Sequence, residues 1–273
     1  MPKRVRPSAI AGTWYPGSHD ALEQAIRSFL DAVPAPDVPD SLFGLIVPHA
    51  AYAFSGPVAA RAYRCLQDKP FDTAVVLSPM HRMPFSSYHV TDADYYETPL
   101  GRIPVNRSLL EEVTAALDCT EIPNDQEHSL EIQLPFLQVV LKSFDLVPIM
   151  IGHSRVYDVS DLVESLHSIY TDRKVVTIAS SDLHHIPDYR AVLKADKRVL
   201  DALSKFNLNE IRQVLSRRDS SVCGRAAISA MIELALKSDA SRLDVLDHCT
   251  SGDVTGKTEP GEYTVGYTAA VVS

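Results

Sequence analysis

The chain has 273 residues, 45% of them hydrophobic and 22% charged, which is typical of a globular protein whose core needs no disulfide. Its 26 basic and 35 acidic residues give a net charge of −9, which argues against a nucleic-acid partner, because nucleic acids are bound mainly through Lys and Arg. No apolar stretch approaches the roughly 20 residues of a membrane-spanning helix, and the start lacks the apolar run of a secretory signal. The four cysteines form no CxxC pair, as expected of reduced thiols. We therefore expect a cytoplasmic protein with no membrane partner.

Apolar residues at helical and strand spacing alternate along the chain. The first half predicts, in order, a helix over 18–33, a buried strand over 43–47, a helix over 57–66 with Pro57 in its first turn, a buried strand over 74–78, two strands over 86–91 and 102–105 that pair across the ETPLG turn, and a helix over 108–117.

The second half continues the alternation. It predicts a helix over 130–144 with Pro135 in its first turn or at a kink, a strand over 146–151, a helix over 159–170, a strand over 175–179, helices over 189–203, 208–215 and 222–236, and strands over 243–246 and 263–272. Residues 1–273 are therefore expected to form a single α/β domain, with a central mixed, largely parallel sheet flanked by helices.

Four of the predicted strands run into a histidine. These residues are His49, His81, His153 and the pair His184 and His185. Chains of alternating strands and helices bind ligands at the carboxyl ends of their strands, where histidines can form a metal or acid–base site. A lone histidine is more often structural, which is the default interpretation of His153. The shared strand-end context of His49 and His81 makes a functional site as plausible as a structural role.

The segment SSDLHH follows the strand over 175–179. Asp182 and His185 at such a strand end suit an acid–base pair, with the carboxylate orienting the imidazole. The alternative is that Ser181 or Asp182 caps a short turn. His184 and His185 are adjacent, so at most one of them is expected to face the crevice.

Cys223 is predicted to lie near a helix N-terminus, where the helix dipole and Arg225 would favour a thiolate. The alternative is a small buried hydrophobe. In QEHSLE, Glu127 and Glu131 are spaced to share a helix face, and the simplest interpretation is a polar helix start.

The motifs PHAAYAFSG, SPMH, ETPLG, EHSLEIQLPFL, SSDLHH, VCG and TSGD occur in this order, and together they resemble the Memo family. In prokaryotes that family is described as component B of the AmmeMemoRadiSam system, and its fold resembles class III extradiol ring-cleavage dioxygenases. The resemblance implies metal ligands at His49, His81 and Cys223, and a general base at His185. By the same resemblance, the ligand in the cleft is expected to contact Trp14, Phe54, His128 and Arg225.

The resemblance implies a dioxygenase-like oxidoreductase that uses non-haem iron (Fe²⁺), with His185 moving a proton and Asp182 orienting it. A thiolate ligand also suits copper or zinc. One alternative is a non-catalytic protein that binds metal or a peptide in the same cleft, and another is a metal-dependent hydrolase. The expected partners are a small molecule or peptide in the cleft, with a functional link to AMMECR-type and radical S-adenosylmethionine proteins.

Overall fold

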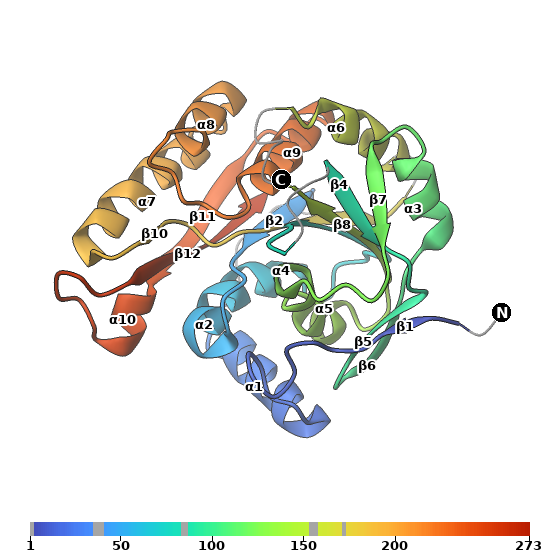
Figure 1. Ribbon diagram of the computed structural model, residues 1–273, viewed down its shortest axis with the longest axis horizontal. Coiled ribbons are helices and arrows are strands. Elements are labelled where there is room, and N and C mark those ends of the chain that lie inside the picture. Colours follow the sequence, from blue (N-terminus) through green and yellow to red (C-terminus); the bar gives the residue numbers. More distant parts are fainter. Residues whose placement is uncertain (1–2, 35–40, 83–86, 153–157, 171–172) are drawn as a thin grey trace.

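The computed structural model describes residues 3–34, 41–82, 87–152, 158–170 and 173–273. The described chain forms a mixed α/β structure around one large sheet (Figure 1). Nine strands make this sheet, in the spatial order β10-β12-β2-β9-β3-β8-β4-β7, with β11 also paired to β12. Their bounds are β2 Gly44–Val47, β3 Thr73–Pro79, β4 Tyr88–Thr91, β7 Cys119–Ile122, β8 Asp145–Ile151, β9 Val175–Ser180, β10 His185–Ile186, β11 Leu243–Thr250 and β12 Thr264–Val272.

The centre of the sheet consists of four parallel strands, β2, β9, β3 and β8. They are almost wholly buried and apolar, because helices cover the sheet on both faces. The pairings of β2 with β12 and of β8 with β4 are antiparallel. The mixed sheet is therefore confirmed, and it is parallel at its centre, where the sequence had the longest apolar runs.

Helices cover both faces. Their bounds are α1 His19–Asp31, α2 Tyr52–Tyr63, α3 Arg107–Thr114, α4 His128–Glu131, α5 Leu134–Leu141, α6 Ser160–His167, α7 Tyr189–Ser204, α8 Leu208–Leu215, α9 Arg225–Lys237 and α10 Ser251–Thr255. In Figure 1, α1, α2 and α5 lie on one side of the sheet and α6 and α9 on the other. Helix α2 packs against β2 and β12, whereas α9 packs against β2, β3 and β9. No helix in the described ranges is long and apolar enough to cross a membrane.

Two predicted helices differ from the observed ones at a proline. Helix α2 begins at Tyr52, so Pro57 lies inside it and not in its first turn. The backbone N–H that Pro57 lacks would have bonded to the carbonyl of Ala53, which is exposed and can be hydrated instead. The single helix predicted over 130–144 is divided into α4 and α5, and Pro135 lies in the first turn of α5, as predicted.

The prediction that strands 86–91 and 102–105 pair with each other is wrong. Strand β4 joins the main sheet between β7 and β8, whereas β6 (Gly101–Pro104) pairs with β5 (Tyr95–Thr98). A separate three-stranded sheet results, in which β1 (Val5–Arg6) pairs with β5 in parallel. The ETPLG turn therefore closes a local hairpin, and its first strand was missed.

Candidate metal centre

The carboxyl ends of β2, β9 and β3 are neighbours in the sheet, and the candidate site lies on this edge. His49 and His81 follow the ends of β2 and β3 by two residues, and Ser180 is the last residue of β9. Cys223 comes from the loop before α9. The adjoining Gly224 allows that loop to approach β9, since a Cβ atom there would lie 2.3 Å from the carbonyl oxygen of Ser180.

Three side chains meet at this edge. His49, His81 and Cys223 each offer one potential ligand atom, and these atoms lie within 4.8 Å of one another. The rings of His49 and His81 are nearly perpendicular, at 85°, with their centroids 5.2 Å apart. The structure therefore brings together the three residues that the sequence resemblance singled out. His153, the remaining strand-end candidate, lies outside the described residues.

A chain of buried hydrogen bonds holds the Nδ1 atom of the His49 ring. Its Nδ1 lies 3.1 Å from Ser180 Oγ, and that hydroxyl donates to the carbonyl of Ser129 at 2.6 Å. Because the hydroxyl proton is used there, Ser180 Oγ accepts the Nδ1–H of His49. It also accepts from Gln133 Nε2 at 2.9 Å. The Nε2 of His49 is therefore left with a free lone pair, as a metal ligand requires.

His81 is held by Glu127, whose side chain is buried. The Nδ1 of His81 lies 2.9 Å from Glu127 Oε1, and the backbone N–H of His81 donates to Oε2 at 2.7 Å. Burial alone would raise the pKa of Glu127, but its contacts with His81 and the proximity of His128 lower it to about 2. The carboxylate is thus ionised and accepts Nδ1–H, so His81 also offers Nε2.

Burial favours the uncharged form of several side chains at the site. Burial lowers the pKa of His49 well below its usual value, and lowers those of His128 and His185 to about 4. Burial, reinforced by Asp182, raises the pKa of the Cys223 thiol, so the expectation of a thiolate is wrong for the metal-free protein. Cys223 lies before the N-cap Gly224, and there desolvation outweighs Arg225 and the helix dipole.

The three polar residues of the segment after β9 have different partners. These residues are Asp182, His184 and His185. Asp182 Oδ1 accepts the backbone N–H of His49 at 2.7 Å, so the carboxylate holds a ligand loop instead of orienting His185 as predicted. Burial raises its pKa to about 7. His185 Nε2 lies 3.2 Å from Cys223 Sγ, whereas His184 Nδ1 lies 2.8 Å from the buried carboxylate of Asp196. Only His185 therefore faces the cluster, as expected of this pair.

Of the four expected ligand-contact residues, Trp14 and His128 lie at the cluster. The Trp14 ring packs on His128 at 4.5 Å between centroids, and His128 stacks on His81 at 4.6 Å. Arg225 is the first residue of α9, two positions from Cys223. Phe54 lies in the first turn of α2, is 36% exposed, and has no described ring contact with the histidines.

Tyr263 was not singled out from the sequence, yet its ring lies 6.2 Å from that of His185 and is 64% exposed. It precedes β12 in a loop, where no periodic pattern marks an aromatic as functional. Trp14 and Tyr263 thus contact different histidines at the margin of the cluster.

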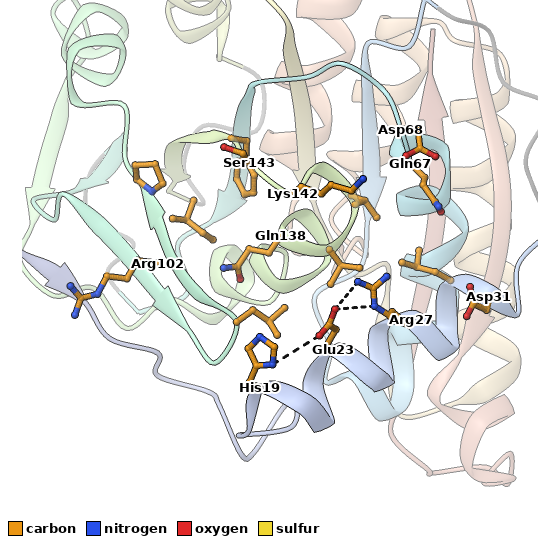
Figure 2. A pocket seen from close by; sticks show the side chains of 17 residues that line it. His19, Glu23, Arg27, Asp31, Gln67, Asp68, Arg102, Gln138, Lys142 and Ser143 are labelled. Atoms are coloured by element: carbon orange, nitrogen blue, oxygen red, sulfur yellow. Dashed lines mark hydrogen bonds and ion pairs between the residues drawn. The ribbon is translucent and has the colours of Figure 1, made fainter.

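Larger hollows lie away from the three candidate ligands. A cavity of about 550 Å³ lies between α1, α5 and β6, lined by His19, Glu23, Arg27, Gln138 and Lys142 among others (Figure 2). Its charges partly neutralise one another, since Arg27 bonds to Glu23 at 2.6 and 2.9 Å. The cavity beside Cys223 and Arg225 has only about 10 Å³, room for about one water molecule. Converging donor groups, and not cavity size, identify the candidate site.

The donor set fits a transition-metal ion. Two imidazoles and one thiol form a mixed nitrogen and sulfur site, which suits zinc, iron or copper better than magnesium or calcium. Each imidazole is oriented through its Nδ1, as is usual for histidines that bind metals. A bound ion would displace the thiol proton of Cys223.

The fold and the site define an α/β protein with a candidate metal centre at the carboxyl ends of its parallel strands. The chain belongs to the Memo family: residues 6–271 match the family described as Memo-like protein. A MEMO1 family protein of Methanosarcina barkeri is 35% identical over 98% of this chain and 100% of its own length. MEMO1 family proteins of Thermotoga neapolitana and Saccharolobus solfataricus are 33% and 32% identical, over 98% and 97% of this chain and 100% and 98% of their own lengths.

Proposed function

We propose that this protein binds one divalent metal ion through His49, His81 and Cys223, and that it is a dioxygenase-like oxidoreductase using Fe²⁺. The observation that carries the proposal is the convergence of three ligand atoms within 4.8 Å, with both imidazoles held through Nδ1. Ionised Glu127 and the thiolate form of Cys223 together carry two negative charges, which a divalent ion balances in this buried setting.

The bound ion would supply an open coordination position and Lewis acidity toward a substrate. Residues of the chain supply the proton acceptor and the surfaces that hold the ligand. His185, neutral and beside Cys223, is placed to accept a proton from a ligand in the site. Asp182 holds the His49 loop through its backbone. Trp14 and Tyr263, packed on His128 and His185, offer aromatic surfaces to the ligand.

Oxygen uptake tests the oxidoreductase. Protein loaded with Fe²⁺ under anaerobic conditions is mixed with oxygen and a series of candidate phenols, and His81→Ala is treated identically. We expect uptake by the wild type alone, stoichiometric with substrate loss. Uptake no greater than that of His81→Ala would refute the oxidoreductase while leaving metal binding open.

A binding protein is the second candidate. The exposed ring of Tyr263 favours it, since such a ring can pack against a side chain of a bound peptide. Calorimetry with phosphotyrosine-containing peptides, before and after metal removal, separates the two functions. Tight binding that survives metal removal supports the binding protein. Elemental analysis of untagged protein shows whether zinc is bound, as a zinc-dependent hydrolase would require. Cytoplasmic localisation and the link to AMMECR-type and radical S-adenosylmethionine proteins stay predictions.

A further inference from the structure

We propose that Glu127 is a positioning residue of the metal centre: its carboxylate orients His81 and His128 and does not itself bind the ion. The inference rests on the proposed function, because it assumes that His81 is a ligand. The alternative is that Glu127 is itself a metal ligand, since His81, Glu127 and His128 also offer ligand atoms within 4.8 Å of one another and could form a second metal site.

The protein already uses most of the hydrogen-bonding capacity of the Glu127 carboxylate. Oε2 accepts the backbone N–H of His81 at 2.7 Å, and Oε1 accepts its Nδ1–H at 2.9 Å. Oε1 also accepts the backbone N–H of Ser129 at 3.1 Å and lies 3.2 Å from Nδ1 of His128. Three of these four groups converge on Oε1, which has only two lone-pair positions, so that oxygen is fully used, whereas Oε2 keeps one position beside the backbone N–H of His81. An ion bound to Oε1 would therefore have to displace at least one of these groups.

Glu127 is itself held rigidly from behind. Its backbone N–H donates to Asp125 Oδ1 at 3.2 Å, and its carbonyl accepts from Arg6 Nη2 at 3.2 Å. Its side chain is buried and it forms the N-cap of α4. A rigid, buried carboxylate fixes the orientation of the side chains to which it is hydrogen-bonded, as the hydrogen-bond partners of metal ligands usually do.

The double contact gives His81 one orientation. Glu127 binds both the backbone and the ring of the same residue: the backbone bond fixes the position of His81, and the imidazole cannot turn without breaking its charge-assisted hydrogen bond to Oε1. The ring then directs Nε2 away from Glu127, and a carboxylate on Nδ1–H makes that atom a stronger ligand. His128 stacks on the same ring at 25°, and Trp14 packs on His128. One carboxylate therefore orients both a metal ligand and a wall of the site.

Cobalt binding tests the inference without relying on activity. Co²⁺ is titrated into metal-free wild type, Glu127→Gln and Glu111→Gln, and absorbance reports affinity, stoichiometry and thiolate-to-cobalt charge transfer. Gln keeps the Oε1 acceptor but places an amide N–H₂ against the backbone N–H of His81. We expect Glu127→Gln to bind one Co²⁺ about 10–100-fold more weakly with the thiolate band retained. Glu111 is exposed on α3, so its variant should match the wild type.

Two results would overturn the inference. One is unchanged cobalt affinity in Glu127→Gln. The other is two Co²⁺ ions per wild-type chain and one in the variant, which would make Glu127 a ligand of a second ion. If Glu127→Gln does not fold, ring-nitrogen NMR of the metal-free wild type decides, because a His81 ring protonated at Nε2 alone contradicts the geometry. If instead the proposed metal site is wrong, Cys223→Ser should bind Co²⁺ like the wild type.

Discussion

Arg6 ties the amino-terminal strand to the segment that supports the metal centre, and we expect Arg6→Met to destabilise the protein strongly. The guanidinium is fully buried. It forms an ion pair with Glu131, lies 3.4 Å from Asp125 Oδ1, and donates to the carbonyl of Glu127. Its Cζ also lies 5.2 Å from the ring centre of Tyr96. Met preserves the apolar stem and removes only the charge and its donors.

The expected loss follows from the partners left behind. Removing one member of a buried ion pair costs about 3–5 kcal/mol, because the other charge remains buried. Glu131 would keep four further donors, which are the Ser8 hydroxyl, the Tyr15 hydroxyl, and the backbone N–H groups of Ala9 and Ile10. We therefore expect the lower end, about 3 kcal/mol, or about 6–12 °C in Tm at the 2–4 °C per kcal/mol typical of chains near this size.

The loss should depend on pH. Burial opposes ionisation of Glu131, but Arg6 and the hydroxyl donors lower its pKa below the usual 4.5. A carboxyl group whose pKa is lower in the folded state stabilises the fold at any pH above its unfolded-state pKa. This stabilisation is lost as the pH falls through the folded-state pKa. The difference between wild type and Arg6→Met should thus be largest where Glu131 is ionised in both folded proteins, and should shrink as the solution becomes more acidic.

Urea unfolding followed by fluorescence provides the assay, because Trp14 is the sole tryptophan and packs on His128. Arg27→Met is the matched control. It breaks an exposed i,i+4 pair with Glu23 and should cost no more than about 0.5 kcal/mol. A loss below about 1 kcal/mol in Arg6→Met, or a loss equal to that of the control, would refute the reasoning.

Two glycine substitutions provide further predictions. In Gly224→Ala the new Cβ would lie 2.3 Å from the Ser180 carbonyl oxygen, so the loop that carries Cys223 must move. We therefore expect the thiolate-to-cobalt absorption band to weaken. An unchanged band would contradict this. In Gly266→Ala the Cβ would lie 1.8 Å from Asp196 Oδ2, which accepts from His248 at 2.9 Å. Displacing that carboxylate should lower stability by about 1–3 kcal/mol in thermal unfolding, and a Tm within 1 °C of the wild type would argue against it.

The strands that form the centre of the fold could be predicted because their apolar runs are long and unbroken. The strand predicted over 146–151 corresponds to β8, and that over 175–179 to β9. Their order could not be predicted, since β9 inserts between β2 and β3, which precede it in sequence. Such pairing depends on contacts between distant segments, which no local pattern records. The pairing of β4 with β7 was missed for the same reason.

The candidate ligands could be identified from strand ends and family motifs, but their supports could not. Glu127 and Glu131 were expected to share one helix face, yet α4 has only four residues. One carboxylate bonds to His81 and the other to Arg6, 125 positions away. The thiol of Cys223 was also misjudged, because a helix start is visible in sequence whereas burial of the preceding loop is not.

X-ray absorption of zinc-loaded, untagged protein tests the central claim most directly, namely that His49, His81 and Cys223 hold one ion. The account predicts one zinc per chain, with one sulfur neighbour at about 2.3 Å and imidazole nitrogens at about 2.0–2.1 Å. Cys223→Ser should lose the sulfur neighbour, and His49→Ala should lose one imidazole. A zinc ion surrounded by nitrogen and oxygen alone, or a spectrum that Cys223→Ser leaves unchanged, would contradict the account.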